Sequence, residues 1–296
     1  MPVTADSASD HSPRTALLLG GSGQIGQALL SRLRAVHWQV LAVSRQAQPA
    51  QAGMEWRRGD LQHMPPLPPT VHAIFSAGPL DAFARWYARG AVQAPRVVAF
   101  GSTSLATKQD SIDAHERDLA MRLAAAEQGV FAHAAATGAQ ATLLRPTLVY
   151  GAGRDASLTQ IAALARRFGW FPLPGGVNGL RQPVHVEDLA DAAMAVIDRA
   201  ATFGKAYALP GGETLTYRAM VARTLAAMSP PARLLELPAP VFRIAVGIAQ
   251  RFDIARSLNA ATIERMRQDL VFDSLPARTD FGYAPRAFAP TAAMLG

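Results

Sequence analysis

The sequence contains no cysteine among its 296 residues. A chain without thiols forms no disulfides and performs no thiolate chemistry, which fits a reducing compartment, and we expect a cytoplasmic protein. Long apolar runs are also missing, because the best candidate, 237–249, is interrupted by Arg243 and falls short of a membrane span. Residues 1–13 lack the cationic start and apolar core of a signal peptide, so we expect a disordered tail.

Lysine is scarce. Lys108 and Lys205 are the two lysines, so arginine supplies nearly all of the basic charge behind the net charge of +7. This excess either reflects a general preference for arginine or provides guanidinium groups for phosphate, which they bind bidentately. No basic run interleaved with aromatic residues is present, so we expect no nucleic-acid partner. We also expect no metal site.

A glycine-rich stretch near the start carries the strongest signal. The apolar run 17–19 leads into Gly20, Gly23 and Gly26, and helical spacing resumes immediately afterwards. A buried strand, a tight turn and a helix in this order let the backbone approach an anion at the helix N-terminus. The stretch therefore predicts a dinucleotide site that includes Gln24 and Ile25, although a βα turn that binds nothing has the same pattern.

Strands and helices alternate after this turn. We expect strands at 39–44, 54–61, 71–76, 96–100 and 141–146, and helices at 81–89, 111–136 and 158–168. This alternation predicts a doubly wound Rossmann-type parallel sheet in an α/β fold.

The pattern loosens after residue 171. Proline and glycine at 172–176 predict a loop, and 184–200 reads as a short strand followed by a helix. We therefore expect a Rossmann domain at 14–170, completed by about 182–210, and a smaller substrate lobe at 171–181 and 211–296. The stretch 237–252 is interpreted as lobe core, and contact with a membrane surface is the alternative.

The end of the second strand bears on the choice of cofactor. NAD-binding sheets place an acidic residue there for the ribose 2′-hydroxyl, whereas a cationic or small polar residue suits the 2′-phosphate of NADP. This chain has Ser44 and Arg45 and no carboxylate at that point. We therefore expect NADP(H) in preference to NAD(H), against the alternative that Arg45 is a solvated loop residue.

Five motifs occur in order along the chain. They are Gly20-x-x-Gly23-x-x-Gly26, Gly59-Asp60-Leu61, Phe100-Gly101-Ser102-Thr103-Ser104, Arg145-Pro146-x-x-Val149-Tyr150-Gly151 and Arg181-x-x-Val184-His185-Val186-x-Asp188-Leu189-Ala190. With them the chain resembles the extended and atypical short-chain dehydrogenases/reductases, specifically the NAD-dependent epimerase/dehydratase family that includes nucleotide-sugar epimerases. The resemblance covers most of the chain, from Thr15 to Tyr283.

This resemblance implies roles for individual residues. Asp60 and Leu61 would lie against the adenine, Ala77 and Gly78 would line the cofactor, and Pro146 would lie near the nicotinamide. Arg181 would hold a substrate diphosphate, in agreement with the affinity of guanidinium for phosphate. His185 would contact substrate or, in the alternative interpretation, orient its loop. The resemblance also implies a homodimer.

One family feature is missing. These enzymes usually transfer hydride with a Ser or Thr, a Tyr, and a Lys four residues further on. Thr103 fits the first position, but counting back from Glu127 places Leu119 and Leu123 at the other two. A leucine cannot transfer a proton, so another group must do so, and His115 is a candidate unless it merely belongs to a capped helix start.

Two functions remain open. The first is an NAD(P)-dependent oxidoreductase or epimerase that acts on a nucleotide-linked sugar or a related small molecule. The second is a non-catalytic NADP(H)-binding sensor or accessory module, which the missing Tyr/Lys pair favours. We expect the enzyme, because Thr103 and Arg181 are both present.

Overall fold

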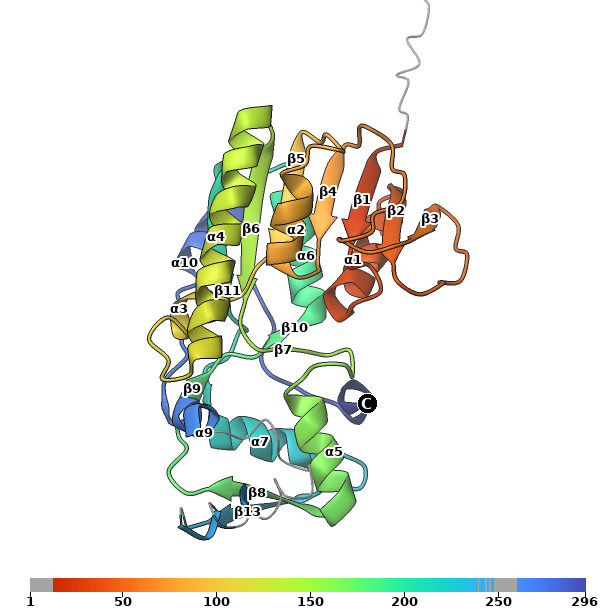
Figure 1. The fold of residues 1–296 in the computed structure, drawn as a ribbon. Coiled ribbons are helices and arrows are strands. Elements are labelled where there is room, and N and C mark those ends of the chain that lie inside the picture. The colour runs from red at the N-terminus through yellow and green to blue at the C-terminus, as the bar shows by residue number, and fades with distance from the viewer. Residues whose placement is uncertain (1–12, 239, 243, 245, 248–259) are drawn as a thin grey trace, which may run out of the picture.

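A seven-stranded sheet organises the protein. The computed structural model describes residues 13–238, 240–242, 244, 246–247 and 260–296. The strands run in the order β11-β6-β5-β4-β1-β2-β3, and every neighbouring pair is parallel (Figure 1). Their bounds are β1 Thr15–Leu19, β2 Gln39–Ser44, β3 Met54–Arg58, β4 Ala73–Ser76, β5 Arg96–Phe100, β6 Gln140–Pro146 and β11 Lys205–Leu209.

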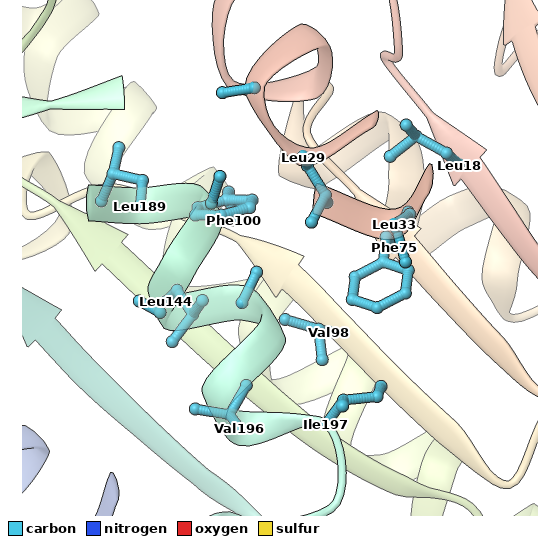
Figure 2. Close-up of a cluster of buried hydrophobic side chains, with 14 of the residues drawn as sticks. Leu18, Leu29, Leu33, Phe75, Val98, Phe100, Leu144, Leu189, Val196 and Ile197 are labelled. Atoms are coloured by element: carbon cyan, nitrogen blue, oxygen red, sulfur yellow. The ribbon is translucent and has the colours of Figure 1, made fainter. Parts of the chain in front are cut away.

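Helices cover both faces of the sheet. Helices α1 (Gln24–Ala35) and α6 (Val186–Val196) lie on one face, and α2 (Leu80–Tyr87) and α4 (Ala114–Thr137) lie on the other (Figure 1). Figure 2 shows the cluster between the sheet, α1 and α6, which includes Leu18, Leu29, Leu33, Phe75, Val98, Phe100, Leu144, Leu189, Val196 and Ile197. The predicted doubly wound Rossmann-type fold is confirmed.

The first strand illustrates why this sequence folds as it does. Leu17 and Leu19 join the cluster under α2 and α4, whereas Leu18 joins the cluster under α1 and α6. Successive side chains of a strand point to opposite faces, and a strand buried on both faces is therefore continuously apolar. Each fully buried leucine contributes about 1.5–3 kcal/mol relative to an exposed one.

A smaller lobe follows the sheet. It contains α5 (Leu158–Phe168), β8 (Trp170–Pro174), α7 (Tyr217–Ala226), β13 (Arg233–Leu237) and α9 (Ala260–Arg267). Leu158, Ile161 and Ala165 of α5 pack with Phe171 and Met220 in a third cluster. The sequence predicts α5 within the Rossmann domain, whereas its apolar stripe packs in this third cluster.

A correction concerns residues 172–176, where a loop was expected. Strand β8 extends to Pro174 and pairs in parallel with β13 in a two-stranded sheet. Both strands of such a ribbon are edge strands, and proline is tolerated where its missing N–H would face away from the partner. Pro172 therefore lies within the strand, and Pro174 ends it.

Short elements join the two parts. The remaining bounds are α3 Ser104–Thr107, β7 Val149–Tyr150, β9 Leu180–Arg181, β10 Val184–His185, β12 Leu215–Thr216, α10 Leu275–Phe281, and the 3-10 helices Ala200–Thr202 and Ala292–Leu295. Strand β7 pairs with β10, and β9 pairs with β12. Ala277 and Phe281 of α10 join the cluster beneath α6, so part of the expected lobe packs on the Rossmann sheet.

Candidate functional site

Two glycines of the loop, Gly20 and Gly26, are packed so closely by backbone atoms that no Cβ fits. A Cβ at Gly26 would lie 2.1 Å from the Gly20 oxygen, and one at Gly20 would lie 2.8 Å from the Ala77 carbonyl carbon. Gly20 also has a φ of +79°, in the left-handed region that favours glycine. The glycines thus bring β1, the start of α1 and the segment after β4 into backbone contact.

The N-terminus of α1 is open. Gly23 is its N-cap, no side chain caps it, and its first turn contains no acidic residue. The free N–H groups and the helix dipole therefore favour an anion at this point. The Gln24 amide oxygen, in the same turn, is buried and has no hydrogen-bond partner among the described residues.

A cleft with a volume of ≈ 460 Å³ opens beside this loop. It lies at the carboxyl ends of β1 to β4, where ligands bind in open parallel sheets. The predicted cofactor residues that line it are Gly20, Gly23, Ser44, Arg45, Asp60, Leu61, Ala77 and Gly78. The structure therefore gathers residues from four separate segments at one edge. The predicted residues Gln24, Ile25, Gly26 and Pro146 lie outside its lining.

The cleft continues into a hollow of ≈ 420 Å³ that Ser22, Ser44, Arg45 and Gln46 line. Ser44 is buried. Its hydroxyl donates to the Ser22 hydroxyl (3.3 Å) and accepts from the backbone N–H of Gln46 (3.3 Å). Arg45 is exposed. The hollow therefore combines hydroxyl groups with one guanidinium and has no carboxylate in its lining.

Asp60 shapes the opposite wall. Its Oδ1 accepts hydrogen bonds from the backbone N–H groups of Gln62 (2.8 Å) and His63 (2.7 Å). The bond from His63 and then that from Gln62 lower the pKa of the Asp60 carboxyl below its usual value. Asp60 thus holds the turn that carries Leu61 into the cleft, and the predicted adenine contact remains a prediction.

Thr103 and Pro146 are close together. The Thr103 hydroxyl donates to the Pro146 carbonyl oxygen (3.1 Å), and the Thr103 backbone N–H donates to the same oxygen (3.2 Å). Both residues are buried, after β5 and at the end of β6. The hydroxyl oxygen keeps its lone pairs for another donor, so its predicted role in proton transfer remains a prediction.

Apolar side chains occupy the two positions of the missing pair. Leu123 is buried in the cluster under α4, and Leu119 packs against the same cluster. His115 is exposed one turn earlier, and Asp113 caps the helix by accepting from the His115 backbone N–H (2.9 Å). This placement favours the interpretation of 111–116 as a capped helix start, and a catalytic His115 remains a prediction.

A charged cluster lies at the same end of α4. The Glu116 carboxylate accepts from the Ser111 hydroxyl (2.6 Å), faces the Lys108 ammonium at 3.5 Å, and pairs with Arg265 of α9. Burial raises the pKa of the Glu116 carboxyl. The Ser111 hydrogen bond and the two cations together lower it by more, so the pKa lies below its usual value. The cluster links the lobe to the Rossmann domain.

Arg181 is engaged with the backbone. Its guanidinium donates to the carbonyl oxygens of Leu180 (2.7 Å), Gln268 (2.8 Å) and Arg265. Arg181 is 6% exposed, and burial lowers the pKa of its guanidinium. These bonds cap the carboxyl end of α9, so the geometry favours a structural role, and the predicted diphosphate contact remains a prediction that it does not support.

His185 is likewise held in place. Its Nδ1 accepts from the Glu187 backbone N–H at the start of α6 (3.2 Å), and its ring lies edge-on to Tyr150. Burial, and next the positive charge of Arg286, lower the pKa of His185. A neutral ring with Nδ1 as acceptor carries its proton on Nε2, which is buried without a partner among the described residues. These contacts favour the loop-orienting interpretation.

The sequence reasoning missed two residues at the glycine loop. Ser22 lines both the cleft and its hollow, and it could have been read from its place between the glycines. Arg154 donates to the Ser22 carbonyl oxygen (3.1 Å), and no local pattern indicates this contact because 132 residues separate the two.

The described residues contain little that indicates membrane contact or metal binding. In the stretch 237–252, residues 239, 243, 245 and 248–252 lie outside the described residues, while Phe242 is buried and Ile244 is 66% exposed. Within the described part of the chain, every helix is too short or too polar to cross a membrane. Nor do His, Asp and Glu side chains there form a group of three or more that could hold a metal ion.

The fold and the cleft define a Rossmann-type α/β protein. Residues 84–209 match the model of the NAD dependent epimerase/dehydratase family. This match confirms the family resemblance expected from the motifs.

Curated relatives and a solved structure agree with this assignment. The chain is 27% identical over 314 residues to a 2-alkyl-3-oxoalkanoate reductase of Stenotrophomonas maltophilia, covering 91% of this chain and 94% of that one. It is 30% identical over 103 residues to a mitochondrial NADH dehydrogenase alpha subcomplex subunit 9 of Arabidopsis thaliana, covering 34% of this chain and only 25% of the relative. The UDP-glucuronic acid 4-epimerase of Bacillus cereus, solved with NAD, has the same fold (TM-score 0.68, 10% identity, 95% and 94% covered).

Proposed function

We propose that this protein binds NADP(H) in the cleft beside the glycine loop. The observation that carries the proposal is the loop itself, where backbone atoms fill the space that a Cβ at Gly20 or Gly26 would need. Such a loop lets a pyrophosphate approach the uncapped start of α1.

The hollow lined by Ser22, Ser44 and Arg45 supports NADP(H) over NAD(H). A phosphate has three acceptor oxygens, which the two hydroxyls, the backbone and the guanidinium can bind together. A ribose hydroxyl would instead need an acceptor such as a carboxylate, and the lining of the hollow contains none. Adenine would lie along Leu61 and Asp60, as the family resemblance implies.

We further propose that the protein acts as an oxidoreductase or epimerase on a nucleotide-linked sugar or a related small molecule. The bound nicotinamide supplies or accepts the hydride in such reactions. Thr103, whose one hydroxyl proton is donated to Pro146, would then accept a hydrogen bond from the reacting hydroxyl group. Support comes from the reductase relative and from the fold shared with the UDP-glucuronic acid 4-epimerase.

A second function is favoured by one observation. Leu119 and Leu123 pack in the apolar cluster under α4, so neither position of the missing pair offers a proton donor. A non-catalytic NADP(H)-binding module needs the cleft but not the donor. The partial likeness to an NADH dehydrogenase subunit is in line with this alternative.

Two measurements test these proposals in sequence. Calorimetric titration should give a lower Kd for NADPH than for NADH, and Arg45→Ala should abolish the difference. Wild-type protein is then incubated with NADP⁺ or NADPH and a panel of nucleotide sugars and 3-oxo compounds, and the products are analysed by mass spectrometry and NMR. Product formation that Thr103→Ala lowers, with NADPH affinity unchanged, supports the enzyme, whereas binding without any product supports the module.

A further inference from the structure

Arg154 reaches the glycine loop from the opposite part of the molecule. It lies in the loop between β7 and α5, two elements that Figure 1 labels. Its Nη1 donates to the Ser22 carbonyl oxygen at 3.1 Å. The guanidinium therefore lies directly beside the turn that precedes the open N-terminus of α1.

The backbone on either side of Arg154 is well anchored. Gly153 has a φ of +65° and packs closely against Gly296. A Cβ added at Gly153 would lie only 3.2 Å from the Gly296 nitrogen. Asp155 is 5% exposed, and its Oδ1 accepts from the backbone N–H of Ser157 (2.9 Å) and from that of Leu158. The one exposed side chain between these two anchored residues is thus projected from a fixed position.

The charge of Arg154 is not neutralised within the protein. Other lobe arginines pair with carboxylates, as Arg223 does with Glu213 and Arg286 with Asp188. Among the described residues, no carboxylate forms an ion pair with Arg154 within 4.0 Å. The bond to Ser22 occupies one of its five N–H donors, so four remain for an anionic partner.

We propose that Arg154 binds the pyrophosphate of the dinucleotide and thereby clamps the cofactor from the lobe side. The proposal rests on the proposed function, since it assigns a partner to the same cleft. The uncapped start of α1 approaches the pyrophosphate from one side, and a guanidinium held beside Ser22 supplies a compensating positive charge. Residues far apart in the sequence thus complete one phosphate site.

Arg154 and Arg45 have distinct roles in this arrangement. Arg45 lines both the cleft and its hollow, whereas Arg154 lines neither and lies beside them at the Ser22 carbonyl. Arg45 therefore discriminates between cofactors through the 2′-phosphate that only NADP(H) carries. Arg154 contacts a group common to both cofactors, so its loss should weaken NADPH and NADH equally.

The test is calorimetric titration of full-length wild type, Arg154→Ala, Arg154→Lys and Arg89→Ala with NADPH, NADH and 2′-AMP. Arg89 is a matched control, because it is an exposed arginine that follows α2 and, unlike Arg154, has no hydrogen bond to the glycine loop among the described residues. We expect Arg154→Ala to raise the Kd of NADPH and of NADH about tenfold or more, the effect of losing a charge-assisted hydrogen bond. 2′-AMP contains the 2′-phosphate but no pyrophosphate, so its Kd should not change.

The lysine variant, the control variant and thermal unfolding separate the clamp from a structural effect. Arg154→Lys should recover part of the affinity, because lysine keeps the charge but loses the planar fork, and Arg89→Ala should match wild type. Thermal unfolding should be unchanged in Arg154→Ala, since the side chain is exposed. Unchanged NADPH and NADH affinities would overturn the clamp, and so would a loss confined to NADPH and 2′-AMP. Wild type that binds neither dinucleotide would instead overturn the proposed function.

Discussion

Replacement of Gly26 by alanine is the most direct perturbation of the glycine loop. The added Cβ would lie 2.1 Å from the Gly20 oxygen and 2.7 Å from the Gly21 Cα, whereas ordinary contact begins at 3.4 Å. Both neighbours are backbone atoms, so the loop must move by about 1 Å, at a cost near the upper end of the roughly 1–3 kcal/mol typical of overpacking. Gly129 offers a matched control, because it also lies within a helix but has no atom within 4 Å of an added Cβ.

The two variants should therefore shift in opposite directions. Gly129→Ala should gain about 1 kcal/mol from helix propensity, or about 2 °C in Tm, whereas Gly26→Ala should lose about 6 °C. Differential scanning calorimetry measures both, and calorimetric titration should show NADPH affinity reduced at least about tenfold in Gly26→Ala alone. A Gly26→Ala variant with wild-type Tm and wild-type NADPH affinity would refute the role assigned to the loop.

Three further predictions concern charged groups. Arg45→Ala should raise the Kd of NADPH about tenfold or more and leave that of NADH unchanged in calorimetry, and an equal effect on both would contradict the 2′-phosphate assignment. Glu127→Gln should lower the free energy of unfolding in urea by about 2 kcal/mol, less than the 3–5 kcal/mol of a fully buried pair, because its partner Arg145 is 31% exposed; an unchanged urea midpoint would contradict this. The folded-state pKa of Glu116 is lowered, so this residue contributes stability above its unfolded pKa, and that stability is lost as the pH falls through the folded value. Glu116→Gln should therefore flatten the decline of Tm between about pH 5 and pH 3. A decline as steep as in wild type would argue against this role.

The sequence was informative wherever a local pattern had only one physical solution. The run 17–19 is apolar and is followed by glycines, and a buried strand with a close βα turn satisfies both features. Ser44 and Arg45 could be placed because they follow a recognisable strand. The carboxyl ends of parallel strands meet at one edge, so these separate segments were expected to form one cleft.

Other assignments depended on contacts that no local pattern encodes. Arg181 lies at a motif position, but its guanidinium caps α9, which follows it by about 80 residues in the chain. The apolar stripe of α5 showed that the helix is amphipathic, yet not whether the sheet or the lobe would bury it. Arg154 has no signature at all, because its contact with Ser22 arises only when the lobe packs beside the sheet.

The same limit applies to the chemistry. Leu119 and Leu123 could be identified by counting from Glu127, and the structure places both against the apolar cluster under α4. Glu116, at the start of the same helix, is held to Lys108 by an ion pair. Which group transfers a proton therefore depends on how a substrate would lie against α4, and sequence spacing carries no information on that.

The central claim is that the cleft beside the glycine loop binds NADP(H). Its most direct test is calorimetric titration of the wild-type protein with NADPH and NADH under identical conditions. We predict saturable binding of both at one site per chain, with NADPH bound about tenfold or more tightly. If neither nucleotide binds, or if NADH binds more tightly than NADPH, the account is contradicted.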